Sequence, residues 1–364
     1  MSSQLEFIAS KFQVEGEVKD IRPLGDGLIN DTFFIETTDN TPNYILQRKN
    51  KHVFTDIPAM MDNIHKVTTH LKKKIILSGG DPLREALTLT PTKEGKLYFL
   101  DDNEDFWTSC LFIEDTKSYP YASSLNLAYQ GGKGIGKFQS LLSDMTQPLA
   151  DVLPGFHNIR FRLDQWDKSL EQDKAGRVKE LSQEIGWIEK RRDEMLAFWV
   201  KVEKGIIPIR VTHNDTKISN ILFDQKGEVL CVIDLDTVLN STCLNDFGDA
   251  IRSYANAGME DDKDINNVYL KMDVFESYTK GYLSEAIVFL IEEEVNHLAF
   301  SAKYITYEQT LRFLMDYIDG DTYYKTAYEE HNLVRTHAQY KLLQSMEENY
   351  EKMKNIVSQI IKNK

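Results

Sequence analysis

The stretch "VTHNDTKISNILFD", Val211–Asp224, joins a polar head to a short apolar run. The run "NILF" is typical of a strand that enters a core, whereas the head has no hydrophobic surface to bury. The residues that follow, "QKGEVLCVID", continue as a turn and a second strand that ends at Asp234. This polar loop is therefore followed by a β-hairpin that delivers a carboxylate at its far end.

Four side chains of this segment have the types and spacing needed for phosphoryl transfer. Asp215 can orient or deprotonate an attacking hydroxyl, and Asn220 and Asp234 offer the oxygen ligands that Mg²⁺ prefers. Lys217 can offset negative charge on the transferring phosphoryl group. Each of them alone could be a turn cap or a strand-end carboxylate. Together, at these spacings, they favour a catalytic site.

Composition bounds the class of protein. The 364 residues are too many for one simple core and predict two domains or one two-lobed domain. A net charge of −14 argues against nucleic acid or an anionic membrane as a partner. The longest apolar runs, "MLAFWV" and "AIVFLI", are far shorter than the ~20 residues that span a bilayer. No signal peptide is visible, and three cysteines cannot form a disulfide framework. We expect a cytoplasmic monomer.

The pattern of elements predicts an α+β protein with two lobes. Residues 1–114 read as strand-strand-strand-helix-strand-strand, with the helix over Ile57–Ile75, which indicates a small antiparallel sheet carrying one helix. Residues 115–364 are mainly helical in pattern apart from the hairpin described above. We therefore expect an N-terminal nucleotide-binding lobe and a larger helical lobe that carries the catalytic loop.

The segment "HNDTKISN…VIDLD" resembles the catalytic and metal motifs of the aminoglycoside phosphotransferase-like kinases, which share the bilobal protein-kinase fold. The N-acetylhexosamine 1-kinases are the closer match, because "YILQR", "VIDLDTV", "DFGDAIR" and "RFLMDYIDGDTYY" resemble their blocks. The resemblance extends from about Leu24 to about Lys325. It implies transfer of the γ-phosphoryl group of ATP, with Mg²⁺, to the anomeric hydroxyl of N-acetylglucosamine or N-acetylgalactosamine.

Other functions stay open at this point. Within the same class, the acceptor could be another small alcohol or amino sugar of the choline, homoserine or aminoglycoside type. A catalytically silent nucleotide-binding pseudokinase is the alternative from another class. A protein kinase is disfavoured, because only eleven residues separate Asp234 from Asp246, too few for a peptide platform.

The resemblance also assigns residues. Asp215 becomes the catalytic base, and Asn220 and Asp234 become the magnesium ligands. Asp236 would be a second carboxylate on the metal side or a sugar contact. Arg312 and Tyr323 fall where sugar-contacting side chains are placed, although from the residues alone they read as a helix-surface arginine and a packed aromatic.

Nucleotide-binding residues are predicted in the N-terminal lobe. In "LGDGLINDTF", backbone amides at Gly25 and Gly27 could cover the phosphates, while Asn30 and Asp31 could touch the sugar. Backbone groups around Phe112–Glu114, after the last strand, would bind the adenine edge.

The third strand departs from the wider fold. It should present a lysine to the phosphates, but "YILQRKN" offers Gln47 or Arg48, of which only one can face the cleft. If Arg48 faces the cleft, it keeps the positive charge and binds the nucleotide, whereas if Gln47 does, the phosphates depend more on metal. Asp62 is the single carboxylate of the predicted helix that could pair with it.

The motif "DFGDAIR" looks like the metal-binding motif of protein kinases but lies too late in the chain. Asp234 already has the expected spacing from Asn220. We expect Asp246 and Asp249 to cap a helix and to pair with Arg252.

Overall fold

The computed structural model describes residues 2–25, 29–38 and 40–363. They form two compact units, each assembled from three stretches of chain. The N-terminal unit comprises Met1–Ser118, Asp144–Pro154 and Ile221–Leu239, and the C-terminal unit comprises Tyr119–Ser143, Gly155–Asn220 and Asn240–Lys364. The sequence predicts a single boundary after residue 114. In the structure, two later segments, 144–154 and 221–239, also belong to the first unit.

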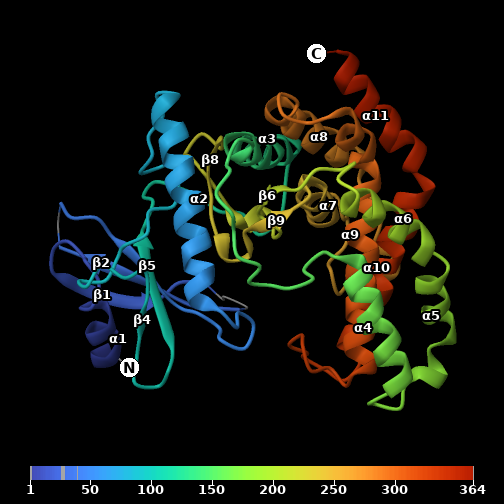
Figure 1. The fold of residues 1–364 in the computed structure, drawn as a ribbon, viewed down its shortest axis with the longest axis horizontal. Coiled ribbons are helices and arrows are strands. Elements are labelled where there is room, and N and C mark those ends of the chain that lie inside the picture. Colours follow the sequence, from blue (N-terminus) through green and yellow to red (C-terminus); the bar gives the residue numbers. More distant parts are fainter. Residues whose placement is uncertain (1, 26–28, 39, 364) are drawn as a thin grey trace. The chain divides into compact units, whose positions relative to one another are not determined.

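A five-stranded antiparallel sheet lies at the centre of the N-terminal unit, with strand order β1-β2-β3-β5-β4 (Figure 1). Its strands are β1 (Val18–Pro23), β2 (Asp31–Thr37), β3 (Tyr44–Arg48), β4 (Phe99–Leu100) and β5 (Phe106–Leu111). Helix α2 (Ile57–Leu77) is inserted between β3 and β4. The predicted antiparallel sheet with one inserted helix is confirmed.

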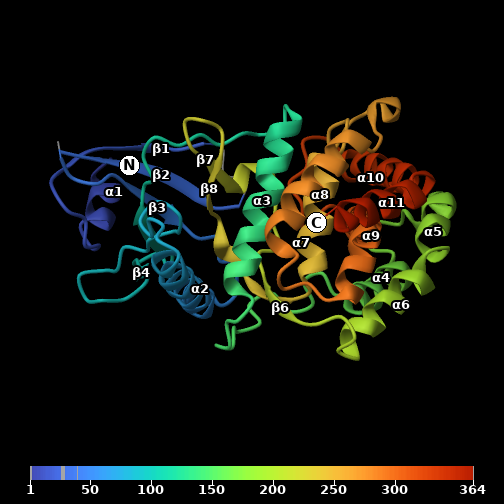
Figure 2. The same ribbon diagram turned by 90° about the horizontal axis from the view of Figure 1, so that it is seen from above.

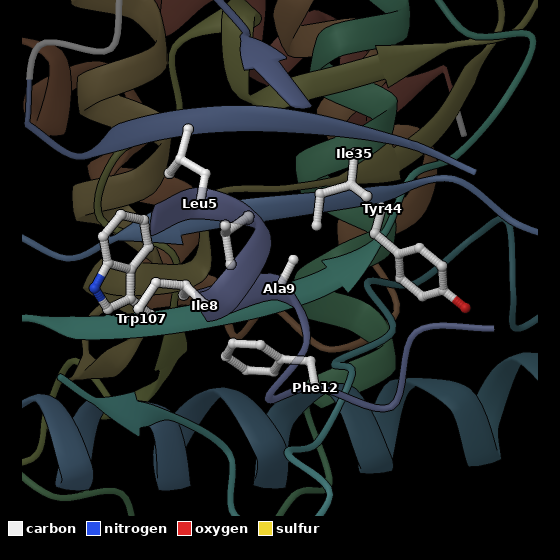
Figure 3. Close-up of a cluster of buried hydrophobic side chains, with 8 residues drawn as sticks. Leu5, Ile8, Ala9, Phe12, Ile35, Tyr44 and Trp107 are labelled. Carbon is white, nitrogen blue, oxygen red and sulfur yellow. The ribbon is translucent and has the colours of Figure 1, made fainter. Parts of the chain in front are cut away.

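Helix α1 (Ser2–Ala9) was not predicted, and it packs on one face of this sheet (Figure 3). The buried cluster there comprises Leu5, Ile8, Ala9, Phe12, Ile35, Tyr44, Leu46 and Trp107. Alternate residues of a strand face opposite sides of a sheet. Tyr44 and Leu46 therefore place Arg48 on the α1 face, whereas Gln47 belongs to the opposite face.

Helix α2 begins where the sequence predicts. The Asp56 side chain caps it by accepting the Ala59 N–H at 3.0 Å, and Pro58 stands in the first turn. Apolar residues at helical spacing form its buried stripe: Ile57, Met60, Met61, Ile64, Val67, Leu71 and Ile75.

The fully buried Asn63 of α2 explains why distant segments belong to the N-terminal unit. Its Nδ2 donates to the carbonyls of Ala150 (2.9 Å) and Val238 (3.4 Å), and its Oδ1 accepts the Ala150 N–H at 2.8 Å. The predicted hairpin, β7 (Ile221–Phe223) and β8 (Val229–Val232), joins the same unit through paired backbone bonds of 2.8 Å between Phe223 and Lys117.

The C-terminal unit is mainly helical. Its helices are α3 (Leu125–Leu142), α4 (Ile159–Gln172), α5 (Ser182–Glu189), α6 (Arg192–Glu203), α7 (Cys243–Tyr254), α8 (Met272–Ala286), α9 (Glu292–Ile318), α10 (His331–Glu348) and α11 (Tyr350–Lys362). In the sequence, the short strands β6 (Arg210–Thr212) and β9 (Leu239–Ser241) flank the predicted catalytic loop and the hairpin. Helix α9 runs through the core of this unit and is buried on most of its sides.

Helices α3 and α8 lie side by side at backbone contact distance (Figure 2). A Cβ atom added at Gly281 of α8 would lie 1.9 Å from the Tyr129 carbonyl oxygen, and one at Gly132 of α3 would lie 2.2 Å from that of Tyr278. Glycine is required at both positions because nothing larger than hydrogen fits between the two helices.

Candidate active site

Three of the residues predicted for catalysis meet in the loop of the C-terminal unit that follows β6. The Asp215 carboxylate accepts hydrogen bonds from Lys217 Nζ (2.8 Å) and Asn220 Nδ2 (2.9 Å) through the same oxygen, Oδ2. Asn220 closes a 3₁₀ turn, Ile218–Asn220, and also donates to the Asp215 carbonyl at 2.9 Å. Asp215 is half-buried, so its carboxylate is held by fixed donors and still reaches solvent.

A carboxylate of helix α7 accepts hydrogen bonds from the backbone of this loop. The Asp246 carboxylate accepts the backbone N–H groups of His213 (2.9 Å) and Asn214 (2.7 Å), and the Gln139 amide at 2.7 Å. Asp246 is fully buried, and that burial raises the pKa of its carboxyl group. The strained, left-handed backbone of Asn214, with φ +65°, is thereby fixed directly before Asp215.

For "DFGDAIR", the expected ion pair of Asp249 with Arg252 is present, whereas the helix cap expected at Asp246 is not. Asp249 pairs with Arg252 at 2.9 Å as predicted, and it also accepts the Thr216 N–H at 2.9 Å. Asp246 caps no helix, because Thr242 caps α7 by accepting the Leu244 N–H. The motif instead supplies the two carboxylates that fix the backbone of the loop that carries Asp215.

The predicted magnesium ligands have the right donor chemistry. Because Asn220 uses its Nδ2 for Asp215, its Oδ1 is turned away from that residue and is left as an acceptor. Asp234 is exposed and has a left-handed backbone, φ +60°, at the end of the hairpin. An amide oxygen and an exposed carboxylate are ligands that suit Mg²⁺, which keeps several waters or phosphate oxygens as further ligands.

In the N-terminal unit, the cation at the end of β3 is Lys49 and not Arg48. Lys49 is buried, and its Nζ lies 2.7 Å and 2.8 Å from the two carboxylate oxygens of Asp236 and 2.8 Å from Gln47 Oε1. Arg48 lies on the α1 face and pairs with Asp31 and with Asp105 at 3.3 Å. The lysine lies one residue beyond the strand, on the face of Gln47, and nucleotide binding by Arg48 stays a prediction.

Asn30 and Asp236, both predicted to touch substrate, belong to the same buried cluster as Lys49. Asn30 Nδ2 donates to Asp236 Oδ2 at 2.7 Å, and its Oδ1 accepts the Asn50 N–H at 3.1 Å. Asn30 thus ties the start of β2 to the end of β3 and orients the carboxylate that holds Lys49. Asp62, considered as the ion-pair partner on α2, pairs with Lys66 at 2.7 Å instead.

The other nucleotide-binding predictions stay predictions. Gly25 has φ +69°, as a glycine turn requires, and Gly27 lies outside the described residues. Near the end of β5, the Phe112 N–H already donates to the Asn43 carbonyl at 2.9 Å. The Glu114 carbonyl accepts Arg84 at 3.1 Å, so these two backbone groups have partners within the unit.

Replacing Lys49 with methionine is expected to weaken MgATP binding and to destabilise the protein by about 3 kcal/mol, because Asp236 would stay buried without its partner. Nucleotide titration and urea unfolding would measure the two effects. Arg48→Met is the matched control, since an exposed ion pair contributes at most about 1 kcal/mol. Equal losses in both variants would contradict the assignment of Lys49.

Arg312 and Tyr323 differ from what their residue types suggested. Arg312 is 8% exposed and Tyr323 is 61% exposed, so the arginine is buried and the tyrosine is not. The guanidinium contacts neutral groups, Gln309 Oε1 at 3.3 Å and the Tyr323 hydroxyl at 3.5 Å. Asp316 fixes the tyrosine's loop by accepting the N–H groups of Thr322, Tyr323 and Tyr324 at 2.8–2.9 Å.

A buried charge cluster beside the catalytic loop was missed. Glu308 of α9 lies 2.8 Å from His157 Nδ1 and 3.5 Å from Arg162 Nε, and His157 Nε2 lies 3.3 Å from the Asn214 carbonyl. Burial alone would raise the pKa of Glu308, but His157 and Arg162 outweigh it and lower the pKa to about 2, from an ordinary 4.5. Glu308 is 151 residues from His157 in the sequence, and no local motif marks the cluster.

Glu308→Gln is expected to reduce stability at pH 7 by up to about 3 kcal/mol. The folded-state pKa of Glu308 is depressed, so its contribution is complete above pH 4.5 and is lost as the pH falls towards 2. Urea unfolding of both proteins at pH 7, 4.5 and 3 would measure the difference, in which all other carboxylates cancel. A difference that does not change with pH would contradict the ion pairing.

Comparison with known proteins assigns the chain to a family. Residues 20–280 match the model described as the phosphotransferase enzyme family, APH. This match covers more than half of the chain, which therefore belongs to that family. The described helices include none that is long and apolar enough to cross a membrane.

Solved structures share the protein-kinase-like fold. A microcompartment-associated aminopropanol kinase is 16% identical with TM-score 0.62, covering 96% of this chain and 98% of its own. A spectinomycin phosphotransferase, in complex with ADP and spectinomycin, is 13% identical with TM-score 0.59, covering 95% and 98%. Choline kinase from Cryptosporidium parvum is 13% identical with TM-score 0.58, covering 96% of each. The predicted α+β kinase-like fold is confirmed.

Proposed function

We propose that this phosphotransferase is a small-molecule kinase that transfers the γ-phosphoryl group of ATP to the anomeric hydroxyl of an N-acetylhexosamine. The observation that carries the proposal is the Asp215 carboxylate with Lys217 and Asn220 bound to it at 2.8–2.9 Å. A carboxylate fixed in this way and open to solvent suits a base that takes the proton of an acceptor hydroxyl.

Each of the other residues has a defined task in this proposal. Lys217 neutralises charge on the transferring group, and Lys49 binds nucleotide phosphate in exchange for part of its contact with Asp236. Asn220 and Asp234 would hold Mg²⁺, which supplies neutralisation of the phosphate charge when bound. The loop backbone stays in place because Asp246 and Asp249 accept its N–H groups.

The buried Arg312 supports a neutral acceptor. Among the described residues, the hydrogen bonds of this cation go to the neutral Gln309 and Tyr323, so it can offer N–H donors to hydroxyl or acyl oxygens. A cationic acceptor would be repelled by this guanidinium. Arg162 is a second guanidinium in this region. Its burial and the nearby charge of Arg312 both lower the pKa of Arg162.

A second candidate is a kinase for a cationic alcohol or amine. It is favoured by the similar structures, whose names describe enzymes that act on aminopropanol, spectinomycin and choline. The chain's net charge of −14 is compatible with cationic acceptors. A catalytically silent nucleotide-binding protein would be supported by the lack of a lysine in the third strand. The buried Lys49, directly after β3, offers a cation there, so this alternative is less well supported.

The test is ATP consumption with Mg²⁺ against N-acetylglucosamine, N-acetylgalactosamine, their unacetylated amines, choline and an aminoglycoside. Turnover limited to the N-acetylated sugars is the expected result, and NMR of the product would identify the phosphorylated hydroxyl. Turnover with choline or the aminoglycoside would overturn the substrate and keep the reaction. Binding of MgATP without turnover on any acceptor would favour the silent protein.

A further inference from the structure

His157 bridges two oxygen acceptors with its two ring nitrogens. Nδ1 lies 2.8 Å from Glu308 Oε2, and Nε2 lies 3.3 Å from the carbonyl oxygen of Asn214. Neither a carboxylate nor a carbonyl oxygen can donate a hydrogen bond, so both bonds exist only if both ring nitrogens carry a proton. A neutral imidazole of either tautomer would leave one nitrogen lone pair facing an oxygen.

His157 is buried among charged groups of both signs. The residue is 5% exposed, and its side chain packs on the ring of Phe156 at a centroid distance of 4.3 Å. The charged groups around it are Glu308 and Arg312 on α9, Arg162 on α4 and Asp249 on α7. Glu308 lies closer to the imidazole than to Arg162, at 2.8 Å from His157 Nδ1 and 3.5 Å from Arg162 Nε.

The backbone on both sides of the bridge is strained. His157 has φ +55° and Asn214 has φ +65°, conformations that residues with a side chain seldom adopt. Asn214 donates its N–H to Asp246, and its carbonyl faces His157, so both backbone polar groups of this residue are held. The next residue is Asp215, whose direction depends on the conformation of Asn214.

We propose that His157 is a positioning residue of the phosphoryl-transfer loop, a doubly protonated imidazolium that ties the Asn214 carbonyl to Glu308 and so fixes the direction of Asp215. The inference rests on the proposed function. Glu308 stands one helical turn before Arg312, so the same bridge links the loop to the helix that carries the proposed acceptor contact.

His331 is a reference within the same protein, because the hydrogen bonds of its ring require a neutral imidazole. It is buried to a similar extent, at 6% exposure, and lies in the same unit. Its Nδ1 accepts the Ala327 N–H at 3.1 Å, while its Nε2 lies 2.9 Å from Asp261. This ring is required to donate from one nitrogen and accept at the other, which is the neutral Nε2–H tautomer.

The decisive experiment is ¹⁵N NMR of the whole protein with labelled histidine at pH 7, assigned by the signals lost in His157→Gln and His331→Gln. The His157 ring is expected to show two protonated nitrogens, and the His331 ring is expected to show one. In Glu308→Gln, the His157 signals should change to those of a neutral ring. A neutral His157 in the wild-type protein would overturn the proposal, whether or not the protein turns over any acceptor.

Kinetics test the positioning role. His157→Gln can donate only one of the two bonds, and we expect its kcat to fall about 10–100-fold, because small displacements of a catalytic group are costly. The Kd for MgATP should change less than about twofold, and His331→Gln should keep the wild-type kcat. An unchanged kcat in His157→Gln would refute the proposal that His157 positions Asp215. A wild-type protein without turnover would count against the proposed function while the NMR result still decides the state of His157.

Discussion

Replacing Asp215 with asparagine is expected to lower kcat for phosphoryl transfer by about 10³-fold. Asparagine keeps the size and one oxygen of the side chain but cannot accept the proton of the acceptor hydroxyl. It also presents an amide, in one of its two orientations, to Lys217 Nζ and Asn220 Nδ2, which both donate to Asp215 Oδ2. The loss should appear in kcat, because the side chain acts in the transition state.

Asp164→Asn is the matched control for this variant. Asp164 is an exposed carboxylate on α4 of the same unit, away from the catalytic loop in sequence, and its replacement should leave kcat and stability unchanged. Steady-state kinetics, MgATP titration and thermal unfolding of both variants would separate a chemical defect from misfolding. Full turnover by Asp215→Asn would remove Asp215 from its proposed role.

Asp246→Ala is expected to destabilise the protein by about 5 kcal/mol and to abolish activity through the loop. The change leaves the buried N–H groups of His213 and Asn214 without this acceptor, and it leaves the Gln139 amide with its longer bond of 3.4 Å to the Cys243 carbonyl. Each such unsatisfied donor costs about 1–3 kcal/mol. Urea unfolding of the purified variant, or its failure to accumulate as folded protein, would measure the effect.

The control for Asp246→Ala lies on the same helix. Thr242 is fully buried, and its side-chain hydroxyl accepts the Leu244 N–H at 3.3 Å as the N-cap of α7. Thr242→Ala should therefore cost only about 1 kcal/mol. Comparable losses for the two variants would mean that Asp246 acts only as another buried residue of α7.

Local patterns in the sequence predicted much of the fold and part of the site. Asp56 and Pro58 mark the start of α2, and the hairpin after Asn220 follows from apolar runs around a turn. Asp215 and Asn220 are five residues apart in one loop, so their contact is a short-range feature that spacing can reveal.

The remaining features depend on distant partners. Lys49 is separated from Asp236 by 187 residues, and His157 from Glu308 by 151. Nothing near Lys49 in the sequence shows that a strand ending at Arg48 leaves the next side chain buried against a carboxylate. The same limit explains Asp246, whose short-range reading as a cap was reasonable, although its acceptors serve the backbone of a loop 32–33 residues earlier.

The N-terminal unit consists of three segments of the chain, which limits when it can fold during synthesis and which fragments of the chain can fold. Asn63 is not satisfied until Ala150 and Val238 are present, so this unit cannot be completed on the ribosome before about two-thirds of the chain has emerged. A fragment that stops at Ser118 would lack both partners and the hairpin that pairs with Lys117. The N-terminal unit is consequently expected to be recovered in its native form only from chains that extend past Leu239.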